Sequence, residues 1–91
     1  MAELVFTPSP LSVYTNGKNR FTVPGSTVIE VVRNFCLQNA AAGRYLLAGE
    51  DHFLPYIRVS VNGTGIRDLE GPGTPVREQD TILIVVASAG G

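Results

Sequence analysis

The segment Thr81-Ile82-Leu83-Ile84-Val85-Val86 is the most apolar part of the chain, and it decides the fold class. Apolar side chains fall on both of its faces, which is typical of a strand inside a sheet, because such a strand is covered on both sides. We therefore predict a central strand over residues 81–86. The longest apolar run of the chain, Ile82–Ala87, overlaps this segment and is far too short to cross a membrane.

The sequence before this segment predicts another strand, over residues 56–61. Apolar and polar residues alternate there, as in a strand with one buried face. That face is expected to hold Ile57, Val59 and Val61. Asn62-Gly63 then indicates a turn, because both residue types tolerate positive φ. We expect a weak strand at residues 64–68, and a loop at residues 70–75, since two prolines and two glycines cannot sustain a strand ladder.

Residues 27–38 predict the main helix. Thr27 and Glu30 fit a capping box, in which the threonine oxygen accepts a hydrogen bond from an amide one turn in and the glutamate reaches back. Apolar residues then recur at spacings of three and four, which places them on one stripe. The members of this stripe are Val28, Val31, Val32 and Phe35. Valine is a poor helix former, so burial of the stripe must stabilise the helix, which we expect to fade between Asn39 and Gly43.

Two short β-type runs open the chain, Leu4–Phe6 and Arg20–Val23. We expect them to pair as a hairpin with a long, irregular connection, in which Asn16-Gly17 marks a turn. One helix can cover one face of the resulting sheet. With the last strand central and beside the first, the order predicts an α+β fold of the β-grasp (ubiquitin-like) type. It would have a mixed four- to five-stranded sheet covered on one face by one main helix.

The composition excludes several classes of protein. The 91 residues suffice for one small domain, and a hydrophobic content of 44% allows it to bury a core. Seven Lys and Arg against eight Asp and Glu give a net charge of −1, which argues against a nucleic-acid partner. One cysteine and one histidine exclude an internal disulfide and a structural zinc site. The first residues lack the cationic flank of a signal peptide, so we expect a soluble, cytoplasmic protein that binds no membrane.

We expect two parts, a β-grasp domain over residues 1–86 and a flexible tail over residues 87–91. The tail, Ala87-Ser88-Ala89-Gly90-Gly91, has only small, uncharged side chains and little surface to dock on its own domain. Extended, it reaches about 17 Å at about 3.4 Å per residue, far enough to enter a deep pocket of another protein. Gly90 and Gly91 lack Cβ atoms and therefore fit a narrow channel.

The carboxylate of Gly91 is the group that would arrive at the end of such a channel. As an anion it can attack the α-phosphorus of ATP and become an acyl adenylate. A sulfur nucleophile that displaces AMP would then leave a terminal thiocarboxylate. A chain with such an end would carry sulfur for other proteins and would not itself be an enzyme.

The chain resembles the ubiquitin-like sulfur carrier family, which includes the small subunit of molybdopterin synthase and the carriers of thiamine and cysteine synthesis. The residues that carry the resemblance are the strand at 56–62, the acidic turn residue Asp80, the strand at 81–85 and the terminal Gly90-Gly91. Two departures concern turn and tail geometry: Gln79 stands where members often have glycine, and Val86-Ala87-Ser88 lacks a proline that many have.

The resemblance implies a set of partners and site residues. Gly91 is adenylated by a ubiquitin-activating-type enzyme, which uses the ATP, so the chain itself holds no cofactor. A sulfurtransferase or acceptor synthase then takes the sulfur, with the chain a monomer alone or the small non-catalytic subunit of a hetero-complex. From the slender tail and the two-sided apolar strand, rather than from the resemblance, the residues expected to bind these partners are Ser88, Ala89, Gly90, Leu83 and Val85. The last two would lie on an exposed apolar patch, unless loops such as Gly43–Pro55 cover it.

Two other functions are compatible with the sequence. A ubiquitin-like modifier would join its terminus to lysines of other proteins, although the single lysine, Lys18, makes chains of itself improbable. A β-grasp interaction module with an unreactive tail is the other. Among isolated residues, we expect Cys36 to be a mostly buried thiol and His52 a surface loop residue. We expect solvated charges at Arg58, Arg67 and Arg77, with contact to an acidic rim of a partner as the alternative.

Overall fold

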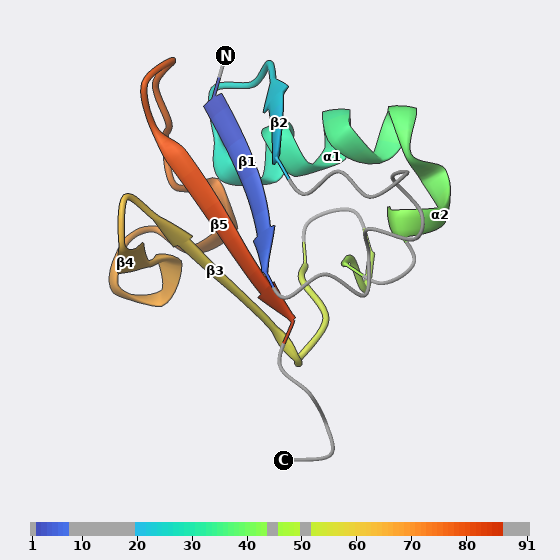
Figure 1. Ribbon diagram of the computed structural model, residues 1–91. Helices are drawn as coiled ribbons and strands as arrows, with labels where there is room; N and C mark the ends of the chain where they lie inside the picture. Colours follow the sequence, from blue (N-terminus) through green and yellow to red (C-terminus); the bar gives the residue numbers. More distant parts are fainter. Residues whose placement is uncertain (1, 8–19, 44–45, 50–51, 87–91) are drawn as a thin grey trace.

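The computed structural model describes residues 2–7, 20–43, 46–49 and 52–86. Within these residues, five strands form one mixed sheet in the order β2-β1-β5-β3-β4 (Figure 1). The strands are β1 Ala2–Thr7, β2 Arg20–Val23, β3 Ile57–Val61, β4 Thr64–Gly65 and β5 Thr81–Val86. β5 runs parallel to β1 and antiparallel to β3, and β1 pairs antiparallel with β2. The predicted β-grasp arrangement, with the last strand central and beside the first, is confirmed.

The helix α1, Val28–Gln38, covers one face of this sheet (Figure 1). All members of the predicted apolar stripe are buried, and the stripe also includes Ile29, which the spacing pattern missed. The stripe residues other than Ile29 belong to one core cluster with the residues of β1, β3 and β5 that face the helix, among them Leu4, Ile82 and Ile84. Burial of each large apolar side chain contributes about 1.5–3 kcal/mol, whereas valine costs only roughly 0.5 kcal/mol in helix propensity. Packing therefore decides that this segment is helical.

Three phenylalanines join the helix to the first hairpin. The ring centroid of Phe6 lies 5.9 Å from that of Phe21 and 5.0 Å from that of Phe35. The rings of Phe21 and Phe35 are 4.8 Å apart at an interplanar angle of 61°. Edge-to-face contacts of this kind add to the free energy of burial. The cluster fixes α1 against β1 and β2.

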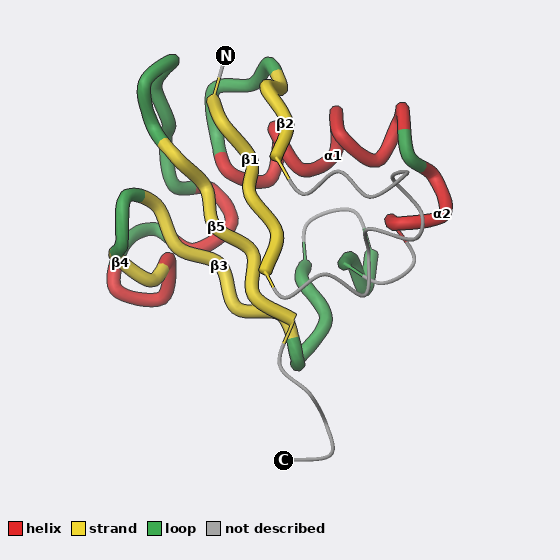
Figure 2. The backbone as a smooth tube through the Cα atoms, in the orientation of Figure 1, coloured by secondary structure: helices red, strands yellow, loops and turns green. Residues whose placement is uncertain are grey.

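Three segments differ from the sequence predictions (Figure 2). The main helix was expected to fade between Asn39 and Gly43. Instead, Asn39 caps α1, and a short helix α2, Ala40–Gly43, follows. The weak strand predicted at residues 64–68 ends at Gly65 and continues as a 3₁₀ turn, η2 Ile66–Asp68. Ile66, at the start of this turn, is buried in the core. The predicted loop at 70–75 contains a second 3₁₀ turn, η3 Gly71–Gly73.

The capping box at the start of α1 is confirmed in one half and wrong in the other. The Thr27 hydroxyl oxygen accepts from the Glu30 amide at 3.2 Å, as predicted. The Glu30 carboxylate, however, accepts from the amide and hydroxyl of Ser26, each at 3.3 Å, and not from Thr27. The reason lies in the tertiary structure: the chain on both sides of Thr27 is held by residues 74–76. The Val28 amide donates to the Thr74 carbonyl at 2.9 Å and the Val76 amide to the Ser26 carbonyl at 3.0 Å.

Gly25, which leads into α1, can be tested by substitution. It has φ of 152°, and an added Cβ would lie 2.6 Å from Val31 Cγ2 and 2.8 Å from the Val31 amide nitrogen. We expect Gly25→Ala to lower the free energy of unfolding by about 2 kcal/mol, measured by chemical denaturation. Gly73→Ala is the matched control, since a Cβ there meets nothing within 4 Å, and it should change stability by less than about 0.5 kcal/mol. Equal effects of the two substitutions would contradict this account.

Candidate functional site

The predicted reacting group lies beyond the part of the chain that the structure describes. Gly91, Gly90, Ala89 and Ser88 all fall in the undescribed residues 87–91, as does the predicted boundary between domain and tail. Their roles therefore stay predictions. What the structure does describe is the strand that leads to them, β5, and the face of the sheet around it.

The sheet face opposite α1, which we call the open face, presents an apolar strip. Val5 of β1 is the direct neighbour of Leu83 in the parallel pairing with β5, and Val85 lies on the same face of β5. All three side chains are partly exposed. Among the described residues of the connector at 43–55, Leu46 is fully buried, and Phe53 and Leu54 pack against the core. Residues 52–55 also line a pocket together with Val85. The predicted site residues Leu83 and Val85 are nevertheless partly exposed, which docking requires.

Charged and polar side chains border the apolar strip on both sides. On the β2 side, an Arg20 guanidinium nitrogen donates to a Glu3 carboxylate oxygen at 2.8 Å. On the β3 side, Ser60 is paired with Leu83 and Arg58 with Val85. The Arg58 guanidinium donates to the Pro55 carbonyl at 2.8 Å, which fixes its position. An apolar centre with a polar rim is the usual anatomy of a surface that binds another protein.

A hydrogen-bonded cluster of Asn62, Arg77 and Asp80 fixes the start of β5. The Asp80 carboxylate accepts from the Asn62 side-chain amide at 3.0 Å and from the Arg77 backbone amide at 2.8 Å. The Asn62 side-chain oxygen in turn accepts from the Thr81 amide at 3.0 Å. The Asp80 carbonyl accepts from the Glu3 amide, so the cluster also joins β5 to β1. Asn62 has a positive φ of 51°, which confirms the predicted turn at Asn62-Gly63.

The isolated reactive residues do not assemble into a second site. Cys36 is partly buried, and desolvation raises the pKa of its thiol above the ordinary value, so it is a weak nucleophile at neutral pH. His52 is exposed on a loop, as predicted. Among the described residues, no three His, Cys, Asp or Glu side chains lie close enough to hold a metal ion. Nor does any helix in the described ranges have the length and hydropathy to span a membrane.

Comparison with known proteins relates the chain to one family. The model of the ThiS family matches residues 13–91. A chain in the crystal structure of the Amycolatopsis orientalis BexX/CysO complex superposes with a TM-score of 0.87 at 27% identity, over 100% of both chains. Mycobacterium tuberculosis CysO gives a TM-score of 0.85 at 18% identity, over 97% of this chain and 100% of its own. No curated protein matches the sequence.

A third structure supports the same fold. Small archaeal modifier protein 1 from Methanosarcina acetivorans superposes with a TM-score of 0.83 at 23% identity. The match covers 99% of this chain and 95% of that protein.

The cluster around Asp80 predicts a pH-dependent stability. The hydrogen bond from Asn62, and then that from the Arg77 amide, lower the pKa of Asp80 below its ordinary 3.8. Because the folded pKa is the lower one, the carboxylate stabilises the fold above about pH 3.8, and this contribution is lost as the pH falls through the folded pKa. We expect Asp80→Asn to lower the free energy of unfolding by about 1 kcal/mol at neutral pH.

The free energies of unfolding of wild type and Asp80→Asn should become more similar at pH values below the ordinary pKa of Asp80. Urea titrations repeated over this pH range measure the difference. Asp68→Asn removes a carboxylate with no hydrogen bond to the described residues, and should change stability by less than about 0.5 kcal/mol. If the difference in free energy of unfolding between wild type and Asp80→Asn stays constant at low pH, the ionised Asp80 carboxylate does not stabilise the fold.

Proposed function

The chain belongs to the ThiS family of ubiquitin-like sulfur carriers, and on this premise we propose that Gly91 carries sulfur as a terminal thiocarboxylate. The family match supports this proposal most strongly, because residues 13–91 include the two closing glycines as well as every described element after β1. In this role the chain is a carrier, and its terminal residue is the substrate of other enzymes.

The chemistry proposed for Gly91 has two steps. A carboxylate oxygen attacks the α-phosphorus of ATP, pyrophosphate leaves, and an acyl adenylate forms. Sulfide then attacks the acyl carbon, the bond to AMP breaks, and the carbon keeps sulfur in place of one oxygen. A carboxylate is a poor acyl donor until it is activated in this way, which is why the first step is needed. Both steps take place in a partner enzyme that binds the ATP.

The open face is proposed as the surface that this partner recognises. Its apolar strip of Val5, Leu83 and Val85 lies on and beside β5, the strand that leads directly into residues 87–91. A partner that covers the strip would hold β5 while the tail enters its active site. The Amycolatopsis orientalis relative was solved in a complex named for BexX and CysO, which supports a protein partner for this chain.

Intact mass tests the proposed chemistry. The chain is incubated with an adenylating enzyme of the ubiquitin-activating type, ATP and sulfide. We expect a gain of about 16 Da, the difference between sulfur and oxygen, and no gain in a chain that lacks Gly91. Circular dichroism should show the shortened chain to be folded, since the buried core residues that the structure describes lie between Ala2 and Ile84. Adducts with lysine amines would indicate a modifier instead, and an unchanged mass would indicate an unreactive interaction module.

Docking through the open face predicts that Leu83→Glu slows adenylation. A charge in the apolar strip should reduce the rate of pyrophosphate release by at least about tenfold, with thermal unfolding still cooperative. Leu37→Glu is the matched control, because Leu37 is 82% exposed on the outer side of α1. If both variants are adenylated at the wild-type rate, the open face is not the recognition surface.

A further inference from the structure

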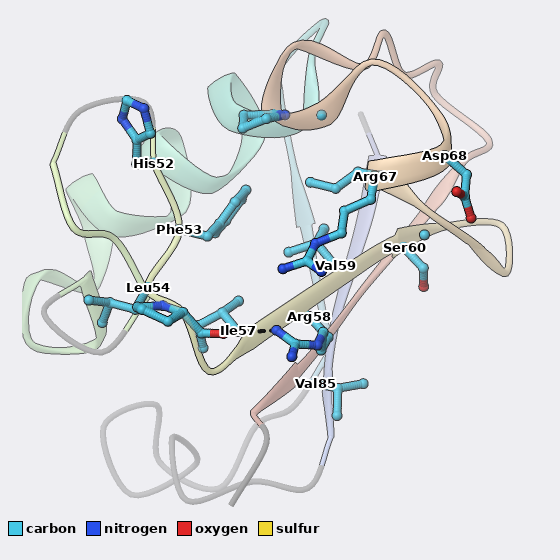
Figure 3. A pocket seen from close by; sticks show the side chains of 15 residues that line it. His52, Phe53, Leu54, Ile57, Arg58, Val59, Ser60, Arg67, Asp68 and Val85 are labelled. Carbon is cyan, nitrogen blue, oxygen red and sulfur yellow. Dashed lines mark hydrogen bonds between the residues drawn. The ribbon is translucent and has the colours of Figure 1, made fainter. Parts of the chain in front are cut away.

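A pocket of about 530 Å³ lies alongside β3 and is not explained by the carrier chemistry (Figure 3). The loop before β3 forms one end, and η2 and η3 form the other. The apolar part of its lining consists of Phe53, Leu54, Ile57, Val59, Ile66, Pro72 and Val85. Ile57, Val59 and Ile66 are buried core residues, so they form a rigid base. A cavity of this size and lining accepts apolar side chains.

Two arginines give the pocket a positive charge. Figure 3 shows the guanidinium groups of Arg58 and Arg67 turned toward its middle, whereas the carboxylate of Asp68 lies at the far side. Arg58 donates one N–H group to the Pro55 carbonyl, and its other N–H groups have no partner among the described residues. Arg67 makes no hydrogen bond or ion pair with any residue in the ranges that the structure describes. Guanidinium groups at an apolar wall are suited to carboxylates, which they bind through paired hydrogen bonds.

The strand beside the pocket has an edge that the sheet leaves open. β4 pairs with β3 only at Ser60 and Val61, after which η2 turns away. Across the described residues, Ile57–Val59 therefore have no strand partner on the side away from β5. Such an edge favours a ligand in extended conformation over a helix, because an extended chain beside β3 would send alternate side chains to the two faces of the strand. One of these faces carries Ile57 and Val59, and the other carries Arg58.

We propose that this pocket binds an extended, acidic segment of a partner protein, in which Asp or Glu alternates with apolar residues. The carboxylates pair with Arg67 and Arg58, and the apolar side chains occupy the base formed by Ile57, Val59 and Ile66. The pocket shares Val85, Arg58 and Ser60 with the open face. A partner that docks on the open face therefore reaches the pocket with a neighbouring segment.

The proposal deepens the function proposed above by describing the partner, but the binding needs no sulfur, ATP or tail. It can therefore be tested on the purified chain alone, with a result independent of whether Gly91 is thiocarboxylated. The probe is a capped octapeptide in which Glu alternates with Val and Leu, titrated into the ¹⁵N-labelled full chain by NMR. Its control is the same peptide with Gln in place of Glu.

We expect amide shifts confined to the residues around the pocket, at 52–60, 65–72 and 85. Arg67→Gln should lower the affinity for the Glu peptide at least about fivefold, and the double substitution with Arg58→Gln should lower it at least about twentyfold. Arg33→Gln removes the same charge from α1 and should leave the affinity unchanged. Raising the salt concentration from about 50 to about 300 mM should lower the affinity for the Glu peptide but not for the Gln peptide, because salt screens the interaction between charges.

Several results would overturn the proposal. One is the absence of shifts up to about 5 mM peptide, which leaves no meaningful affinity. Another is equal binding of the Glu and Gln peptides, or equal weakening by Arg67→Gln and Arg33→Gln. Shifts that move on dilution of the chain without peptide would identify a second copy as the occupant. Inorganic phosphate that displaces the peptide and produces the same shifts would identify a simple anion site.

Discussion

The parallel pairing of β5 with β1 in the middle of the sheet is the constraint on which the rest of the structure depends. Leu4 lies beside Ile82 and Phe6 beside Ile84, so the first and last strands jointly form the base on which α1 packs. The parallel direction requires a connection that crosses the sheet, and α1 is part of that connection. Each of these two strands has one edge left for a further neighbour. β2 therefore lies beside β1 on one side of the pair, and β3 and β4 lie beside β5 on the other side.

The same pairing decides what faces outward. Alternation along a strand sends Ile82 and Ile84 to the helix and Leu83 and Val85 to the other face. Parallel register then brings Val5 beside Leu83, and antiparallel register brings Arg58 beside Val85. The apolar strip and the arginine-lined pocket are therefore neighbours through β5 and β3, although their residues are scattered along the sequence. A single partner can use both, which makes recognition dependent on two different chemistries.

Periodicity was enough to predict the parts of the fold that repeat. The stripe of α1 and the alternation of Ile57, Val59 and Val61 are visible in the sequence because burial acts on every third, fourth or second residue. Contacts that depend on tertiary register were not predictable. Asn62 and Asp80 are 18 residues apart and meet only when β3 and β5 are paired. Glu30 reaches Ser26 because residues 74–76 hold the chain there.

In the candidate site, too, some features follow from the sequence pattern and others depend on tertiary register. The accessibility of Leu83 and Val85 follows from their alternation with buried isoleucines, and the sequence predicted it as one of two alternatives. Val5 was missed, although it alternates with Leu4 and Phe6, because its contribution depends on which strand lies beside it. Arg67 is exposed, as expected of a solvated charge, and contact with an acidic rim of a partner was the alternative. Its place in a pocket with Arg58 follows from η2, which the pattern of residues 64–68 did not predict.

The most direct test of the central claim is to locate the sulfur atom within the loaded chain by fragmentation mass spectrometry. The account predicts an added mass of about 16 Da on the fragment that contains Gly91, as one oxygen is replaced by sulfur. A gain of about 32 Da on the fragment that contains Cys36 would instead mark a persulfide on the thiol, and would contradict the carrier chemistry proposed for Gly91.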